Sequence, residues 1–217
     1  MTISVQNPSA DITDFESDFD DQLALDQDAQ DLLFRGARTP NTFTDEPVSD
    51  EQVEAIYDLA KWAPTSMNSQ PLRILLVRSP AARARLVQTM ADGNKAKTAA
   101  APLVAILAAD HAFHENFSKT FPHFPGARDM FAANDTMRAK TADTNATLQV
   151  AYFILAVRAA GLAAGPMAGY DATALNDTFF PKSEHEVLAV VNIGKPGPNA
   201  WKGRLPRLDF DEVVTTV

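Results

Sequence analysis

Apolar residues recur along this chain in two patterns, one helical and one typical of short strands. At helical spacing, Val53, Ile56 and Leu59 follow Ser49 and Gln52, a pair whose spacing matches a capping box. On such signals the expected helices are residues 23–36, 49–64, 80–90 and 135–160, with another beginning at Asp171. Continuous apolar runs predict buried strands over 74–77, 103–109 and 187–193. Helices alternating with a few buried strands predict an α+β or α/β sandwich.

One long stretch fits neither pattern. Residues 112–130 hold four phenylalanines and two prolines. We therefore expect a short helix and an excursion that covers a pocket. Met67, Phe124 and Phe131 are candidate pocket walls, although side chains of these types are more often part of a core.

The length of 217 residues and the hydrophobic content of 46% suit one globular domain with a full core. The charge is uneven along it. Residues 1–31 hold nine acidic residues and no basic one, and the other 19 acidic residues balance the 19 basic ones. So acidic a segment, with few large apolar residues, does not bury enough surface to fold by itself. We expect residues 1–27 to be an acidic leader, flexible or wrapped along a partner subunit, and residues 28–217 to form the single domain.

Several classes of protein are excluded by what the sequence lacks. The absence of cysteine excludes disulfides, thiolate catalysis and zinc–sulfur sites. The most apolar stretches, 99–109 and 150–160, are too short to cross a membrane, and no secretory signal is evident, so a cytoplasmic location is expected. No basic face for nucleic acid is evident. His111 and His114 lack a convincing third ligand, so no metal site is expected.

Four loops carry the candidate chemistry. The first holds Arg38, Thr39 and Asn41, and a planar guanidinium beside a hydroxyl suits a phosphate ester. The second covers residues 63–71, where a dense run of hydroxyl and amide side chains between two buried elements indicates a ligand. Each of these two loops, taken alone, is also compatible with an ordinary solvated loop or turn.

The third loop covers residues 161–171, where glycines let the backbone approach a flat ligand and leave N–H groups free to point at it. An ordinary loop ending in an Asp171 N-cap is the alternative. The fourth joins residues 192–195 to Arg204 and Arg207, cations without a run of carboxylates nearby. A phosphate is therefore a reasonable partner, with plain surface charge as the alternative for Arg204.

Taken together, these loops resemble those of the nitroreductase superfamily, over roughly residue 32 to the C-terminus. The sequence Ala-Pro-Thr-Ser-Met-Asn-Ser-Gln-Pro at 63–71 is similar to the family's most specific segment, and Gly-Pro-Met-Ala-Gly-Tyr-Asp at 165–171 to its second. Within the superfamily the chain is most similar to the malonic semialdehyde reductase subfamily of pyrimidine degradation. The points of similarity are residues 37–39 with Asn41, 61–66, 121–123 and 204–208.

The resemblance implies a three-layer α/β sandwich, with a central mixed sheet flanked by helices, in an intertwined homodimer that binds FMN at the subunit interface. It places Arg38, Thr39 and Arg207 at the FMN phosphate and Asn41 at the pyrimidine edge of the flavin. Residues 64–68 approach the flavin from the second subunit, and the backbone of 166–169 faces its N5. The implied cofactor-binding residues are Arg38, Thr39, Asn41, Pro64, Thr65, Ser66, Asn68, Pro166, Met167, Ala168, Gly169, Arg204 and Arg207.

Two positions depart from the family pattern. Many relatives have lysine or arginine where this chain has Asn41, and the neutral amide would stabilise an anionic reduced flavin less. Many have glutamate where this chain has Ala168, so any role of that carboxylate is absent here.

The resemblance further implies that hydride passes from NADH or NADPH to flavin N5 and then to a small acceptor, so that no side-chain nucleophile is required. The specific form expected is the reduction of 3-oxopropanoate (malonic semialdehyde) to 3-hydroxypropanoate. A broad nitroreductase or quinone reductase is one alternative. A non-catalytic flavin-binding or partner-interaction protein is another. No catalytic side chain can be named from the sequence.

Overall fold

The computed structural model describes residues 22–217. Most of the expected acidic leader, residues 1–27, therefore lies outside the described residues. No helix in the described part of the chain is long and apolar enough to cross a membrane.

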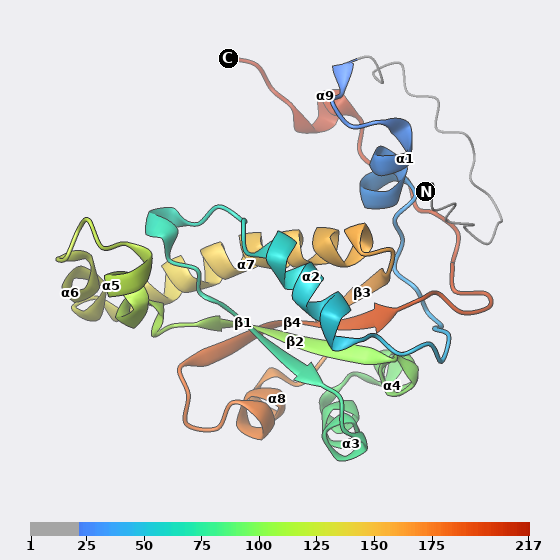
Figure 1. The fold of residues 1–217 in the computed structure, drawn as a ribbon, viewed down its shortest axis with the longest axis horizontal. Helices are drawn as coiled ribbons and strands as arrows, with labels where there is room; N and C mark the ends of the chain where they lie inside the picture. Colours follow the sequence, from blue (N-terminus) through green and yellow to red (C-terminus); the bar gives the residue numbers. More distant parts are fainter. Residues whose placement is uncertain (1–21) are drawn as a thin grey trace.

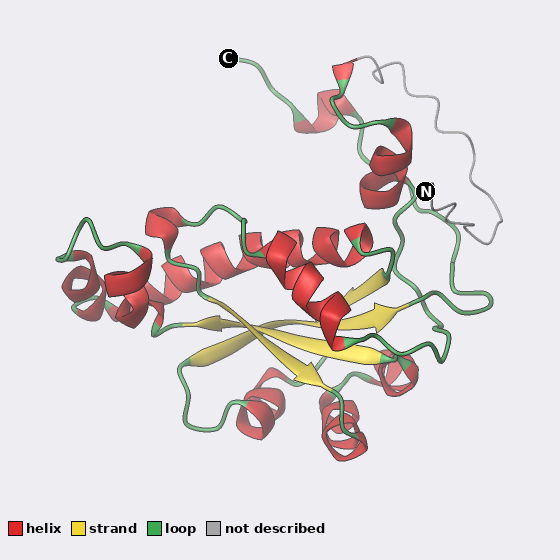
Figure 2. Ribbon diagram, in the orientation of Figure 1, coloured by secondary structure: helices red, strands yellow, loops and turns green. Residues whose placement is uncertain are grey.

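A four-stranded sheet forms the middle of the molecule (Figures 1 and 2). Its strands are β1 (Leu72–Val77), β2 (Leu103–Asp110), β3 (Ala163–Met167) and β4 (His185–Gly194), in the order β1-β2-β4-β3. All three pairings are antiparallel, so the sheet of the described residues differs from the expected mixed sheet. The strands β2 and β4 are central, and all eight residues of β2 are buried. The edge strands β1 and β3 are each paired on one side only.

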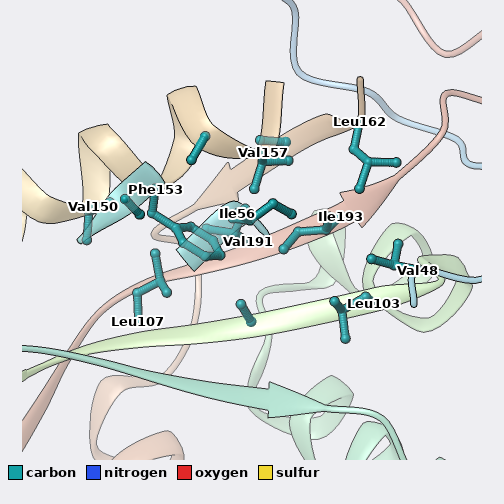
Figure 3. Packing of buried hydrophobic residues seen from close by; sticks show 14 residues of the cluster. Val48, Ile56, Leu103, Leu107, Val150, Phe153, Val157, Leu162, Val191 and Ile193 are labelled. Atoms are coloured by element: carbon teal, nitrogen blue, oxygen red, sulfur yellow. The ribbon is translucent and has the colours of Figure 1, made fainter. Parts of the chain in front are cut away.

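Helices cover both faces of this sheet, which makes three layers (Figure 1). On one face lie α2 (Asp50–Ala60) and α7 (Asp135–Ala159), and on the other lie α3 (Pro80–Thr89), α4 (Asp92–Ala100) and α8 (Ala172–Phe179). Alternate residues of a strand point to opposite faces, so the sheet supplies a separate core to each layer. Figure 3 shows the first core, where Phe153 and Val157 of α7 and Ile56 of α2 pack over Val191 and Ile193 of β4.

A third hydrophobic cluster packs against the N-terminal half of α7. It is built by a 3-10 helix (Phe113–Asn116), α5 (Phe117–Thr120) and α6 (Ala127–Ala132). The rings of Phe113, Phe117 and Phe131 meet edge to face, with centroids 5.1 to 5.7 Å apart. Phe131 is thus a core residue, Met67 packs against this cluster, and Phe124 is 48% exposed. The segment expected to cover a pocket is mostly a small core of its own.

Both terminal segments lie outside the three layers, above α2 and α7 in Figure 1. They contain α1 (Gln27–Gln30), a π-helical turn (Asp31–Arg35) and α9 (Phe210–Val213). Their large apolar side chains are largely exposed, with Phe34 at 53%, Leu208 at 71% and Phe210 at 72%. Apolar surface of this extent is typical of a segment that packs against another chain.

Most of the helix starts that the structure confirms were predicted from capping residues. Ser49 and Gln52 form the expected capping box, Ser79 caps a helix that has Pro80 in its first turn, and Asp171 caps α8. Gly161, after α7, has a φ of +72°, as its C′ position requires.

Some elements were not expected from the sequence, and two were described wrongly. The helices α4 and α9 and the strand β3 were not expected. The helix that starts at Asp50 ends at Ala60, before Pro64, and β1 is an edge strand with mostly half-buried residues rather than a buried one. The sequence does not predict β3 because it contains Gly165 and Pro166, residue types that weaken strands. Pro166 is tolerated because an edge strand needs no N–H on its outer side.

Candidate functional site

The loop with Arg38, Thr39 and Asn41 lies against the segment that follows β4. The N–H of Asn41 donates to the Ala200 carbonyl at 2.8 Å, and its side-chain amide donates to the same oxygen at 3.2 Å. Farther along, the N–H of Thr44 donates to the Lys195 carbonyl at 3.0 Å. These contacts join the first and fourth candidate loops into one surface. The Asn41 side chain thus helps to hold this loop through its amide nitrogen, and its contact with a flavin stays a prediction.

Arg38 is half-buried on this surface, with its guanidinium carbon 5.8 Å from the centre of the Trp201 ring. No carboxylate of the described residues forms an ion pair with it. Close by, the Arg204 guanidinium donates to the Arg35 carbonyl. A guanidinium held on an aromatic ring, with its charge uncompensated and the exposed Thr39 next to it, is a donor set that fits a phosphate ester.

Lys195 and Arg207, the other two cations of the fourth candidate loop, have different partners from Arg38. Lys195 forms an ion pair with Glu46 at 2.8 Å, a carboxylate that is not local in the sequence. The two residues are far apart in the sequence and meet only because the loops do. Arg207 is exposed and donates to the carbonyls of Leu205 and Pro206 in its own segment.

Residues 165–169 form the end of the edge strand β3 and the turn after it. A Cβ on Gly165 would come within 3.8 Å of Pro40, so this strand lies beside the Arg38 loop. The Gly169 carbonyl accepts from the Ala91 N–H at 3.0 Å and from the Asn94 side chain at 2.9 Å. A Cβ on Gly169 would come within 2.6 Å of that side-chain nitrogen, so Asn94 packs directly against this glycine. The first, third and fourth candidate loops thus form one continuous surface.

Residues 64–70 form the connection between α2 and β1, and their backbone is unusual. Met67, Asn68 and Gln70 all have positive φ, at 52°, 50° and 44°. A side chain in this left-handed region costs roughly 1–2 kcal/mol, less for asparagine. Pro64, Ser66 and Asn68 are nevertheless exposed. Strain kept in an exposed loop indicates a functional shape, since the surrounding structure must enforce it.

Several side-chain hydrogen bonds enforce this shape. Asn145 of α7 accepts the Ser66 N–H at 2.6 Å, and the Asn68 side chain donates to the Thr120 carbonyl at 2.8 Å. Inside the loop, the Gln70 N–H donates to the Thr65 hydroxyl at 3.3 Å, and the Gln70 side chain donates to Asn68. The loop is therefore pinned to both α7 and α5.

One chain does not bring all the predicted residues together. Loop 64–70 precedes β1 at the end of the sheet where Leu72 pairs with Ala109, whereas the Arg38 surface adjoins the end where Ile193 pairs with Leu103. The six steps along β2 from Leu103 to Ala109 span about 20 Å. In Figure 1 the connection between α2 and β1 lies on the side of the molecule that holds α5 and α6. The chain before α2 lies on the opposite side. The predicted site residues therefore lie in two separate groups, which we call half-sites.

His111 and Tyr170 make hydrogen bonds within the described residues, and His114 is buried. Burial lowers the pKa of His114, which lies behind the aromatic cluster. Burial raises the pKa of Tyr170, whose hydroxyl donates to the Val187 carbonyl at 3.1 Å. His111 contacts Asp143 at 2.8 Å. The described residues contain no group of three or more His, Asp or Glu side chains that could hold a metal ion.

Comparison with known proteins identifies the family. The model of the Nitroreductase family matches residues 34–195, which include Arg38, loop 64–70 and β3. The chain belongs to the Nitroreductase family.

A relative of this Nitroreductase-family chain in Streptomyces griseus is 63% identical over 195 residues, which are 90% of this chain and 99% of the relative. That protein carries the provisional name NADH dehydrogenase/NAD(P)H nitroreductase.

Solved structures show the same fold at low sequence identity. A provisionally assigned nitroreductase of Bacillus subtilis aligns with a TM-score of 0.75 at 20% identity, covering 85% of this chain and 97% of that chain. Another, from Exiguobacterium sibiricum, was solved in complex with FMN and aligns with a TM-score of 0.74 at 19% identity, covering 85% of this chain and 95% of that chain.

The structure adds residues to this Nitroreductase-family site that the sequence did not point to. Trp201 supports Arg38, Asn94 holds Gly169, and Asn145 and Gln149 hold loop 64–70 and the start of β1. The one usable signal was the spacing of Asn145 and Gln149, two amides four residues apart on the longest predicted helix, which places them on one face.

Proposed function

We propose that this protein is an FMN-dependent oxidoreductase that uses NADH or NADPH to reduce a small acceptor. The observation that carries the proposal is the half-buried Arg38, stacked on Trp201 beside β3 and without a carboxylate partner in the described residues. The FMN in the Exiguobacterium sibiricum structure and the NAD(P)H nitroreductase name of the Streptomyces griseus relative support it. When bound, FMN supplies the redox chemistry, since a flavin accepts a hydride and passes it on.

In this proposal, different residues of the chain bind different parts of FMN. Arg38 and Thr39 hold the phosphate, with Arg204 and Arg207 as further cations. Asn41 fixes the loop that carries Arg38, since its amide donates to the Ala200 carbonyl. Pro166, Met167, Ala168 and Gly169 place the end of β3 and the turn after it against the flat ring. No side chain transfers a proton in this scheme.

The second half-site comes from another copy of the chain. Pro64, Thr65, Ser66 and Asn68 precede the end of the sheet opposite to the one that adjoins the Arg38 surface, about 20 Å apart along β2, so in our account they reach its cofactor across a subunit interface. A two-fold axis brings one half-site of each chain against the other half-site of its partner. Suitable apolar surface is available on α2, α7 and the loop after α2, where the exposed large side chains are Tyr57, Leu59, Trp62, Leu148 and Tyr152.

The specific substrate that we propose is 3-oxopropanoate, reduced to 3-hydroxypropanoate in pyrimidine degradation. Its support is the similarity of residues 37–41, 61–66, 121–123 and 204–208 to the malonic semialdehyde reductase subfamily. A broad nitroreductase or quinone reductase is the second candidate, favoured by the name of the Streptomyces griseus relative. The expected location is the cytoplasm.

Oxidation of NADH or NADPH by the FMN-loaded protein tests the proposal. The acceptors compared are 3-oxopropanoate, a nitroaromatic compound and a quinone, each at several concentrations. The largest kcat/KM with 3-oxopropanoate supports the specific form, and a larger value with either of the others favours the second candidate. No turnover with any acceptor would leave a flavin-binding protein without catalysis and would overturn the proposed activity.

A further inference from the structure

Two amide side chains lie on the buried face of α7. Asn145 and Gln149 are one helical turn apart and only 5% and 6% exposed. Their neighbours Ala142, Ala146 and Val150 are buried and apolar. A buried amide is destabilising unless it is hydrogen-bonded, so its partners indicate its role.

Both amides accept backbone N–H groups from the same segment. The Asn145 oxygen accepts from Ser66 at 2.6 Å, and the Gln149 oxygen accepts from Leu72 at 2.9 Å. Asn145 also donates from its amide nitrogen to the Thr141 carbonyl at 2.7 Å, one turn back in the helix. Helix α7 thus fixes the segment at two points, one near each end.

The backbone between these two points holds the strained conformation. Met67, Asn68 and Gln70 are left-handed without being glycine. Such a segment relaxes to an easier conformation unless its surroundings prevent this. The Asn145 contact comes at Ser66, directly before the first left-handed residue, so its loss releases the exposed part of the loop first.

We propose that Asn145 is a positioning residue for the cofactor site, and that it keeps loop 64–68 in the shape that meets FMN across the subunit interface. The inference rests on the proposed function, in which this loop approaches the flavin of the partner. Asn145 does not touch the flavin and acts through the Ser66 N–H. Its loss lowers the fraction of molecules with a competent loop, and the apparent Kd for FMN rises by the same factor.

Two substitutions separate the loop contact from the helix contact. In Asn145→Ser the shorter hydroxyl can still donate to the Thr141 carbonyl four residues back, but it does not reach Ser66. In Asn145→Asp the oxygen that accepts from Ser66 is kept and the donor to Thr141 is lost. A role in the loop predicts that serine is the harmful change, whereas a role in helix stability alone predicts that serine is the milder one.

A matched control lies on the other face of the sheet. Asn176 of α8 also accepts a strand N–H, from Val187 at 3.2 Å, through its side-chain oxygen. Asn176→Ser removes the same kind of bond on the opposite face of the sheet from loop 64–70, together with the bond from the Asn176 amide nitrogen to Glu186. We expect a lower melting temperature and an unchanged FMN affinity.

The test is a titration of each full-length apoprotein with FMN, followed by the quenching of flavin fluorescence. Hydrogen–deuterium exchange of the peptide containing Ser66 is measured in parallel on apoprotein. We expect about a tenfold higher Kd for Asn145→Ser, the upper range for one lost hydrogen bond, and a Kd within about threefold of wild type for Asn145→Asp. Hydrogen–deuterium exchange at Ser66 should be faster in Asn145→Ser than in the wild type. This measurement requires neither an active enzyme nor the Asn145→Asp variant.

The outcomes distinguish the two proposals. A wild-type protein that takes up no FMN overturns the proposed function and this inference with it. Binding by the wild type with unchanged Kd and unchanged exchange in Asn145→Ser overturns the inference alone. Equal weakening of FMN binding by Asn176→Ser also overturns it, because the loss would then follow from reduced stability.

Discussion

Replacing Arg38 with alanine removes the half-buried guanidinium that rests on Trp201. In our account this group donates to the FMN phosphate. A charge-assisted hydrogen bond of this kind contributes about 1.5–3 kcal/mol. Since 1.4 kcal/mol is a factor of ten, the Kd for FMN should rise by a factor of roughly 10 to 100.

The assay compares FMN with riboflavin, which has the same ring and no phosphate. Each apoprotein is titrated with both ligands, and the quenching of flavin fluorescence gives both Kd values. Arg38→Ala should weaken FMN binding and leave riboflavin binding within about twofold, because the contact that is lost belongs to the phosphate. Added salt should weaken FMN binding less in the variant than in the wild type, since one charge–charge contact is gone.

Arg85 provides the matched control for Arg38. Its guanidinium also stacks on an aromatic ring, that of Phe179 at 5.4 Å, but on the far face of the sheet. Arg85→Ala removes the same charge and the same type of stacking, and it should leave both affinities unchanged. The assignment of Arg38 to the phosphate would be refuted by an unchanged FMN affinity in Arg38→Ala, or by an equal loss for FMN and riboflavin.

Three further predictions concern the cap of α2, a buried histidine and the leader. Ser49→Ala removes one half of the capping box of α2. It should lower the free energy of unfolding by about 1 kcal/mol and the melting temperature by about 2–4 °C. An unchanged melting curve would contradict a stabilising role of this cap. Burial lowers the pKa of His114 from 6.5, so the unfolded chain binds more protons and stability falls as the pH drops below 6.5 toward the lowered value. His114→Gln should lose less melting temperature than the wild type between pH 7.5 and 5.5, and an equal loss excludes this histidine as a cause. Deletion of residues 1–27 should leave the FMN content unchanged, and the protein should still sediment as a dimer. Loss of either would assign the leader a role in assembly.

Local signals in the sequence predicted much of the fold. Ser49, Pro80 and Asp171 act within one helical turn, so a pattern of a few residues is enough to place the starts of their helices. By contrast, β3 forms only because β4 offers it a partner, and its Gly165 and Pro166 argue against a strand when read alone. The helix α4 was missed because Ala91 at its N-cap makes no side-chain hydrogen bond and its apolar stripe is weak.

The site was predictable in its residue types but not in its geometry. Arg38 and the polar run at 63–71 suggested a phosphate and a ligand from chemistry alone. Their distribution over two half-sites depends on strand register, and the Lys195–Glu46 ion pair depends on two distant loops meeting. Asn145 sits on a correctly predicted helix, yet its partner Ser66 lies 79 positions away. Contacts of such long range cannot be read from a local pattern.

The most direct test of the central claim is the visible absorption spectrum of the purified protein, reconstituted with FMN if it is colourless. The spectrum is recorded without oxygen before and after addition of NADH or NADPH. Our account predicts flavin bands that persist through gel filtration and bleach when the nicotinamide is added. A protein that retains no flavin after incubation with excess FMN, or whose flavin bands stay unchanged with both nicotinamides, would contradict it.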